Sequence, residues 1–295
     1  MAAGGRGGAA EIRGVWWWTS ADNAWGVDRV LGDKAKAAEM IRFLNAWNFD
    51  RVYCSFSTDT RAHPALIYAW NSKLHAAGIS SQFLLGENTW IFPDSRPNLL
   101  SVHIQSDFLD FNAAATNAAG RYDAVHLDIE PHGLPAWNVA SPNERKHLLR
   151  LLRDTVREVR SYLDAHAAKD IPIYADLPVW FDQVGKPVGW DSAGERDAWF
   201  ADMAQALAGI SLMAYERNTA ARIDSGVAWE IQTFKNEVRV GLEASVGVGK
   251  TWSSTSNLLT MIQTQESSNP PRRVDIHDFV QFHEIVTKPQ KTNAP

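Results

Sequence analysis

Short runs of apolar, β-branched and aromatic residues alternate along this chain with longer stretches in which apolar residues recur every three or four positions. Short runs of this kind predict buried strands, and the longer repeat predicts amphipathic helices. The clearest helix covers 143–166, because Ser141, Pro142 and Glu144 form a capping signal before its apolar stripe. The expected strands are 12–19, 51–57, 81–86, 122–130, 171–177, 209–215, 238–243 and 278–284. The other expected helices are 33–47, 63–77, 99–119, 194–207 and 256–266, and the pattern is weakest over 218–235.

The alternation of strands and helices places the chain in the α/β class with a parallel sheet. Eight such repeats in about 280 residues predict a single (β/α)8 barrel, the TIM barrel. An open doubly wound sheet is the alternative, but it usually carries a glycine-rich nucleotide-binding turn after its first strand, and "WWWTSADNAWG" has none. We expect a flexible N-terminal segment over 1–10, the barrel over 11–286 and a flexible tail over 287–295.

Composition and charge exclude several classes of partner. The chain has 295 residues, of which 45% are hydrophobic, as in an ordinary globular protein. A net charge of −5 without a basic tract argues against nucleic acid and anionic membranes, and no apolar run is long enough to span a membrane. The single cysteine, Cys54, excludes an internal disulfide. The N-terminal stretch "MAAGGRGGAA" lacks the apolar centre of a signal peptide and resembles a linker or a trimmed start. We expect a secreted or periplasmic protein whose signal is absent here, with the cytoplasm as the alternative. The oligomeric state is left open.

The stretch "YDAVHLDIEPH" (122–132) places ionisable groups inside an expected strand. His126, Asp128 and Glu130 occupy alternate positions, so they share one face. In a (β/α)8 barrel the carboxyl ends of the strands form the active site. Mutual repulsion between two nearby carboxyls separates their pKa values and leaves one acid and one carboxylate near neutral pH. Cleavage of a glycosidic bond requires this combination, and Glu130, nearest the strand end, is the expected acid.

Polar and aromatic side chains are also expected at the ends of the other strands. Burying charges without partners costs several kcal/mol, so the many polar side chains at the carboxyl ends of the strands, the mouth of the barrel, favour a functional site. The 13 tryptophans suit a carbohydrate site, since a flat ring covers the apolar face of a pyranose. The expected substrate-binding residues are Trp18, Tyr53, His126, His132, Asp176, Trp180, Glu216 and His283. We expect His126, which lies deeper in its strand, to be a hydrogen-bonded partner of Asp128.

Two motifs resemble those of a known family. "YDAVHLDIE" resembles the strand-4 signature D-G-x-D-x-D-x-E of family 18 glycoside hydrolases, the chitinases and endo-N-acetylglucosaminidases, with Asp123, Asp128 and Glu130 at its first Asp, last Asp and catalytic Glu. "SLMAYE" resembles that family's strand-6 M-x-Y-D segment, with Met213 and Tyr215 at its Met and Tyr. Among the departures, His126 stands where the signature has its middle Asp, and Glu216 stands where the family has Asp or Asn.

The resemblance implies substrate-assisted catalysis, in which the N-acetyl oxygen of the substrate is the nucleophile. Glu130 would protonate the leaving group, Asp128 would orient the acetamido group and Tyr215 would bind its carbonyl oxygen. The implied substrate is an oligo- or polysaccharide that contains a β-linked N-acetylhexosamine. This mechanism needs neither a metal nor an organic cofactor.

Three other functions fit parts of the pattern. "IEP" and "GLE" resemble the large glycosidase clan with a glutamate at the ends of strands 4 and 7, in which Glu130 would be acid/base and Glu243 the nucleophile. A metal-dependent hydrolase could use His126, Asp128, Glu130 and His132, with His283 as a further ligand. A non-catalytic glycan-binding barrel is the third, although the presence of Glu130 argues against it. Both glycosidase mechanisms predict retention of configuration.

Overall fold

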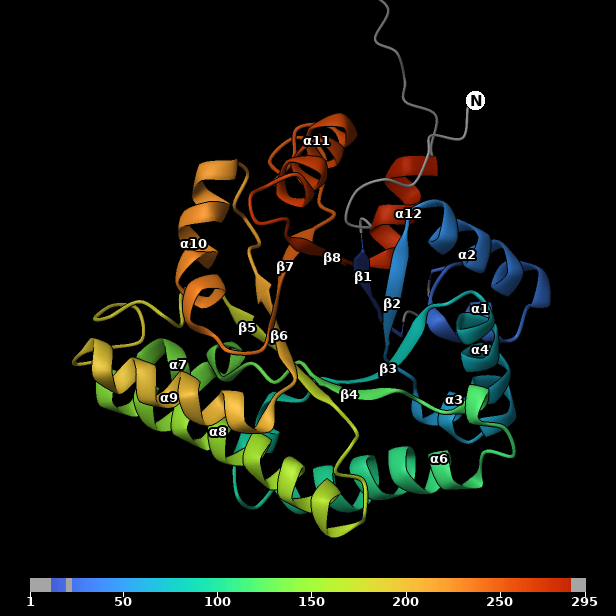
Figure 1. Cartoon of the computed structure of the whole chain (residues 1–295), viewed down its shortest axis with the longest axis horizontal. Helices are drawn as coiled ribbons and strands as arrows, with labels where there is room; N and C mark the ends of the chain where they lie inside the picture. Colours follow the sequence, from blue (N-terminus) through green and yellow to red (C-terminus); the bar gives the residue numbers. More distant parts are fainter. Residues whose placement is uncertain (1–11, 20–22, 288–295) are drawn as a thin grey trace, which may run out of the picture.

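The computed structural model describes residues 12–19 and 23–287. The expected flexible segment 1–10 lies outside them, as does the expected tail 287–295 except for its first residue, Thr287, which ends a helix. Eight parallel strands pair in chain order, and β8 closes the ring against β1. Helices surround this ring (Figure 1), so the predicted single (β/α)8 barrel is confirmed. The strands are β1 (Arg13–Trp17), β2 (Phe49–Cys54), β3 (Ser80–Leu85), β4 (Ala124–Leu127), β5 (Ile173–Pro178), β6 (Gly209–Met213), β7 (Glu237–Glu243) and β8 (Arg273–His277).

The outer layer consists of helices that bury one apolar face each against the barrel. The long ones are α2 (Lys34–Ala46), α4 (Pro64–Ala76), α8 (Pro142–Ala165), α9 (Ala193–Ala206), α10 (Ala220–Thr233), α11 (Thr255–Glu266), α12 (Phe279–Thr287) and the π-helix η2 (Leu99–Asp110). The shorter ones are α1 (Val27–Leu31), α3 (Thr58–Arg61), α5 (Arg96–Asn98), α6 (Phe111–Ala114), α7 (Pro135–Val139), η1 (Asn88–Ile91), η3 (Ala118–Gly120) and η4 (Pro131–Gly133). In the described part of the chain no helix has the length and apolar character needed to cross a bilayer.

The predicted start of α8 is confirmed in detail. The Ser141 hydroxyl accepts a hydrogen bond from the Glu144 backbone N–H, and the Glu144 carboxylate accepts one from the Ser141 N–H at 2.6 Å. These reciprocal bonds satisfy N–H groups that have no partner within the helix.

The last strand lies earlier in the chain than the sequence pattern predicted. The structure forms β8 over Arg273–His277, and the expected strand 278–284 is instead part of helix α12. Phe279, Phe282 and His283 all lie on one buried face, because spacings of three and four residues bring side chains together on a helix. His283 stacks on Trp25 at 4.1 Å between ring centroids. It therefore lies in the outer helical layer, which corrects its expected place at the barrel mouth.

The three consecutive tryptophans of β1 point in alternate directions, as strand geometry requires. Trp17 points outward and packs against Trp70 of α4, with ring centroids 4.8 Å apart. Trp16 and the following Trp18 point inward, where Trp16 packs against Tyr53 and Leu84. Through Trp17, this run therefore also packs against the outer helical layer.

The amino-terminal half of the barrel interior holds an ionic network. Asp275 of β8 accepts a hydrogen bond from Arg239 of β7 and one from the Ser211 hydroxyl of β6, both at 2.6 Å. Arg239 and Asp275 are almost fully buried, at 2% and 0% exposure. Because each buried charge has its counter-charge, this layer can support a polar site above it.

Candidate active site

Asp128 and Glu130 leave the barrel just past the end of β4. The backbone N–H of Asp128 donates to the Leu85 carbonyl at 2.8 Å, which extends the pairing with β3 beyond the strand. The backbone N–H of Glu130 donates to the Asn88 side-chain oxygen at 2.7 Å. Both residues are thus fixed at the barrel mouth. Asn88 was not among the predicted site residues, since a lone asparagine after a strand carries no specific sequence signal.

The two carboxyl groups interact directly. Burial raises the pKa of Asp128 well above its usual range, and the nearby charges of Asp176 and Glu130 raise it further. Burial also raises the pKa of Glu130, and a hydrogen bond with Asp128 partly offsets this rise. These directions describe a protonated Asp128 that donates to Glu130. Both pKa values are thus shifted upward, which favours a proton shared within the pair.

His132 lies beside Glu130, and Trp180 packs against His132. His132 Nε2 is 3.6 Å from a Glu130 carboxylate oxygen, and its ring meets Trp180 edge-on at 5.3 Å between centroids. Burial lowers the pKa of His132 to about 4, so the ring is neutral near pH 7. This wall of the mouth is accordingly aromatic and uncharged next to the acid.

Asp176 of β5 lies level with Asp128 on the neighbouring strand, because Leu127 is in register with Ala175. Its two oxygens are both used: one pairs with His126 Nε2 at 2.8 Å, and the other accepts from Trp16 Nε1 at 2.8 Å. His126 thus has Asp176 as its carboxyl partner in place of the expected Asp128. His126 and Asp176 are buried, at 1% and 2% exposure, so their positions do not support the predicted contact with substrate.

Tyr53 also lies deeper than expected. Its ring lies 4.0 Å from that of His126 between centroids, and only 1% of the residue is exposed. Among the described residues its hydroxyl has no hydrogen-bond partner. The residue packs below the site, so its position does not support the predicted contact with substrate.

Aromatic rings line the opposite side of the mouth. Trp18 Nε1 donates to His277 Nε2 at 3.1 Å, and Tyr215 lies 5.1 Å from His277 between ring centroids. The far edge of Trp18 reaches Gly86 beside Asp128: a Cβ on Gly86 would lie 3.3 Å from Trp18 Cη2 and 3.6 Å from the Asp128 Cβ. The indole therefore extends from the end of β8 toward the acid pair.

His277 was missed because the last strand was expected too late in the chain. The run "VDIH", which ends at His277, was its available signal. Burial lowers the pKa of His277, so its neutral ring can accept the Trp18 hydrogen bond.

Glu243 and Glu216 meet at the ends of β7 and β6. A Glu243 carboxylate oxygen accepts hydrogen bonds from the Glu216 backbone N–H at 2.9 Å and from the Thr251 hydroxyl. Glu216 itself is exposed and has a left-handed backbone, with φ of 62°. In the described structure Glu243 thus ties two loops together, and one of its oxygens is already occupied.

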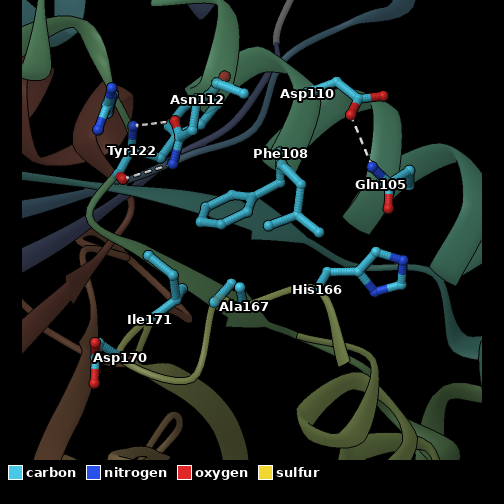
Figure 2. Close-up of a pocket in the computed structure, with 13 residues that line it drawn as sticks. Gln105, Phe108, Asp110, Asn112, Tyr122, His166, Ala167, Asp170 and Ile171 are labelled. Atoms are coloured by element: carbon cyan, nitrogen blue, oxygen red, sulfur yellow. Dashed lines mark hydrogen bonds between the residues drawn. The ribbon is translucent and has the colours of Figure 1, made fainter. Parts of the chain in front are cut away.

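Figure 2 shows a pocket at the other end of the barrel, with a volume of about 470 Å³. Phe108 and Ile171 line it, and Asn112 exchanges two hydrogen bonds with the Tyr122 backbone at its edge. Tyr122 and Ile171 precede β4 and β5, so this pocket faces the amino ends of the strands. It is separate from the carboxyl pair.

Comparisons with known proteins agree with this architecture. No model of a known protein family matches the chain, and no curated protein matches it. Among solved structures, an endo-β-N-acetylglucosaminidase from Cordyceps militaris aligns with a TM-score of 0.56 and 11% identity, over 95% of this chain and 90% of that one. A family GH18 chitinase from Chromobacterium violaceum aligns with a TM-score of 0.57 and 12% identity, over 93% and 79%. The barrel shares the fold of family 18 glycoside hydrolases. At these identities the likeness is one of fold.

Proposed function

We propose that this protein is a retaining glycoside hydrolase in which Glu130 is the general acid. The observation that carries the proposal is the hydrogen-bonded carboxyl pair of Asp128 and Glu130 at the carboxyl end of β4, in which burial raises both pKa values and so favours a retained proton. The leaving oxygen of a glycoside needs such a proton as its bond to the sugar breaks.

We further propose that the substrate supplies the nucleophile. Its acetamido oxygen attacks the anomeric carbon as the glycosidic C–O bond breaks, and the leaving oxygen takes the shared proton through Glu130. The positive oxazolinium ion then lies beside the deprotonated Asp128. Water attacks the same carbon, returns a proton to Glu130 and reopens the ring, so the original configuration is retained.

Two features support this route. Asp128 Oδ1 is buried and has no hydrogen-bond partner among the described residues, so an acetamido N–H would satisfy it. Tyr215 lies beside His277 and Trp16 at the mouth, where its hydroxyl could bind the acetamido oxygen. The aligned solved structures include enzymes named for N-acetylglucosamine and chitin, which makes a β-linked N-acetylhexosamine the substrate to test first.

We also propose that Trp18 forms the platform for the sugar. Its indole is half-buried, held by His277 and adjacent to Asp128 through Gly86. An indole held by its N–H keeps its face available for the apolar side of a pyranose.

The test is hydrolysis of aryl β-glycosides with and without a 2-acetamido group. Glu130→Gln should lower kcat by about 10²–10⁴-fold, whereas Glu39→Gln on the exposed face of α2 should leave it unchanged. Unchanged turnover in Glu130→Gln would refute both glycosidase mechanisms.

The same experiment separates the alternatives. Hydrolysis of non-acetylated glycosides at full rate would favour Glu243 as the nucleophile. Loss of activity on chelation, restored by a divalent ion, would favour the metal-dependent hydrolase, although the described residues contain no group of three metal-ligating side chains. Glycan binding without turnover would favour the binding protein.

A further inference from the structure

A chain of buried polar side chains supports the acid pair from below. Trp16 of β1, Asp176 of β5, His126 of β4 and Gln82 of β3 are linked by hydrogen bonds of 2.8 to 2.9 Å. None of them is more than 2% exposed. The bond from Trp16 to Asp176 joins strands that lie four places apart in the closed ring, so it crosses the barrel interior.

The orientation of the Gln82 amide favours one tautomer of His126. Burial lowers the pKa of His126 to about 3, so the ring is neutral near pH 7 and carries one proton. The Gln82 side-chain oxygen faces Nδ1 and accepts that proton's hydrogen bond at 2.9 Å. In this tautomer His126 Nε2 is an acceptor, and the hydrogen bond of 2.8 Å to Asp176 then places a proton on the Asp176 carboxyl group.

Electrostatics favours the same state. Asp176 lies level with Asp128 on adjacent strands, which are about 4.8 Å apart in a sheet. An ionised Asp176 would place a second buried negative charge against the Asp128–Glu130 pair. Asp275 also lies near, but Arg239 balances its charge. Six titratable groups face Asp176 and interact with it through a hydrogen bond or through electrostatic effects on their pKa values. They are His126, Asp128, Glu130, Tyr53, Tyr215 and Asp275.

We propose that Asp176 and His126 form a neutral hydrogen-bonded support that confines the negative charge of the site to the Asp128–Glu130 pair. Position 126, where the strand-4 signature has a carboxylate, holds the histidine, and the neighbouring strand supplies the carboxyl group. Asp176 is thus a positioning residue. This inference rests on the proposed function.

The decisive variant is Asp176→Asn. An amide has the same hydrogen-bonding pattern as a protonated carboxyl, because its NH₂ can donate to His126 and its oxygen can accept from Trp16. It should retain kcat within about threefold of wild type, with unchanged midpoints of the pH profile of kcat/KM. Asp176→Ala, which leaves both partners unpaired, should lose about 10–100-fold in kcat.

The opposite pattern would overturn the inference. If Asp176 were ionised, Asp176→Asn would remove a charge beside Asp128 and Glu130 and move the alkaline midpoint to lower pH. The inference would also be overturned if the Asp176→Asn protein were unfolded or inactive, or if the Asp176→Ala protein kept wild-type activity.

A measurement without substrate separates this inference from the proposed function. Nitrogen-15 NMR of histidine-labelled wild-type protein should show His126 as a neutral ring protonated at Nδ1 from pH 7 down to pH 5. A ring protonated at Nε2, or at both nitrogens, would overturn the support even if the enzyme cleaves glycans. The expected tautomer in a protein without hydrolase activity would leave the support standing and refute only the function.

Discussion

Gly86 offers a sharp test of the platform formed by Trp18. In Gly86→Ala the new Cβ would lie 3.1 Å from the Asp128 carbonyl oxygen and 3.3 Å from Trp18 Cη2. Both contacts are tighter than ordinary van der Waals distance. Relief of the first contact requires a shift of the backbone at Gly86 or Asp128, and relief of the second requires a shift of the indole, each by a few tenths of an ångström.

This displacement should affect activity more than stability. Overpacking of this kind costs about 1–3 kcal/mol, and the exposed position of Gly86 places this substitution toward the low end. A shift of the sugar platform next to the acid should lower kcat/KM on an N-acetyl aryl glycoside by about 10-fold, since misplacement by 1 Å can cost 10²-fold.

The matched control is Gly32→Ala, where the nearest atom to the new Cβ is the Asp28 carbonyl oxygen at 3.9 Å. This variant should keep wild-type kcat/KM and melt at or slightly above the wild-type temperature. Steady-state kinetics and thermal unfolding of the three proteins check the prediction. Wild-type kcat/KM in a folded Gly86→Ala protein would show that Trp18 does not position the sugar.

Three further predictions address the acetamido contact, a buried acid and the barrel interior. Tyr215→Phe should lower kcat by about 10–10³-fold on N-acetyl substrates, because it removes one donor to the reacting oxygen, and equal losses on non-acetylated substrates would contradict this role. Burial raises the pKa of Glu230 to about 8, and neither of its oxygens has a partner among the described residues. Its native pKa is above its unfolded value, so its contribution to stability is complete below about pH 4.5 and is lost as the pH rises toward 8. Glu230→Gln should therefore gain about 1–3 kcal/mol relative to wild type between pH 5 and pH 8 in urea unfolding, with Glu39→Gln as the flat control. Arg239→Met leaves Asp275 buried without its cation and should cost about 3–5 kcal/mol in the same assay, and a loss below 1 kcal/mol would show that water or another group compensates.

The fold was largely predictable because parallel strands buried on both faces appear as short apolar runs. The first seven expected strands coincide with β1 to β7 to within a few residues at each end. The eighth was misplaced because "FVQFHE" fits both a two-residue and a four-residue repeat. Only the packing of Phe279, Phe282 and His283 on the rings of Trp25, Phe43 and Trp47 selects the helix.

The contacts within the candidate site were predictable only between residues that are neighbours in the sequence. Asp128 and Glu130 are two residues apart, and strand geometry alone brings them together. The partners of His126 lie 44 and 50 residues away, on strands whose register no local pattern encodes. The same holds for Asn88, which is 42 residues from Glu130. Tyr53 was expected at the mouth because sequence gives the direction of a strand residue but not its depth in the barrel.

The bond from Trp16 to Asp176 has a consequence for protein engineering. It connects opposite walls of the ring, and both of its side chains are almost fully buried. The spacing of the strands beneath the acid pair is therefore set from inside the ring. The loops that follow β3 and β4 carry Asn88 and the two carboxyls, but loops after the other strands can be exchanged for longer or more aromatic ones while the distance between the two carboxyls stays the same. The barrel is thus a scaffold suited to loop grafting, in which cleavage chemistry and sugar choice can be altered one at a time.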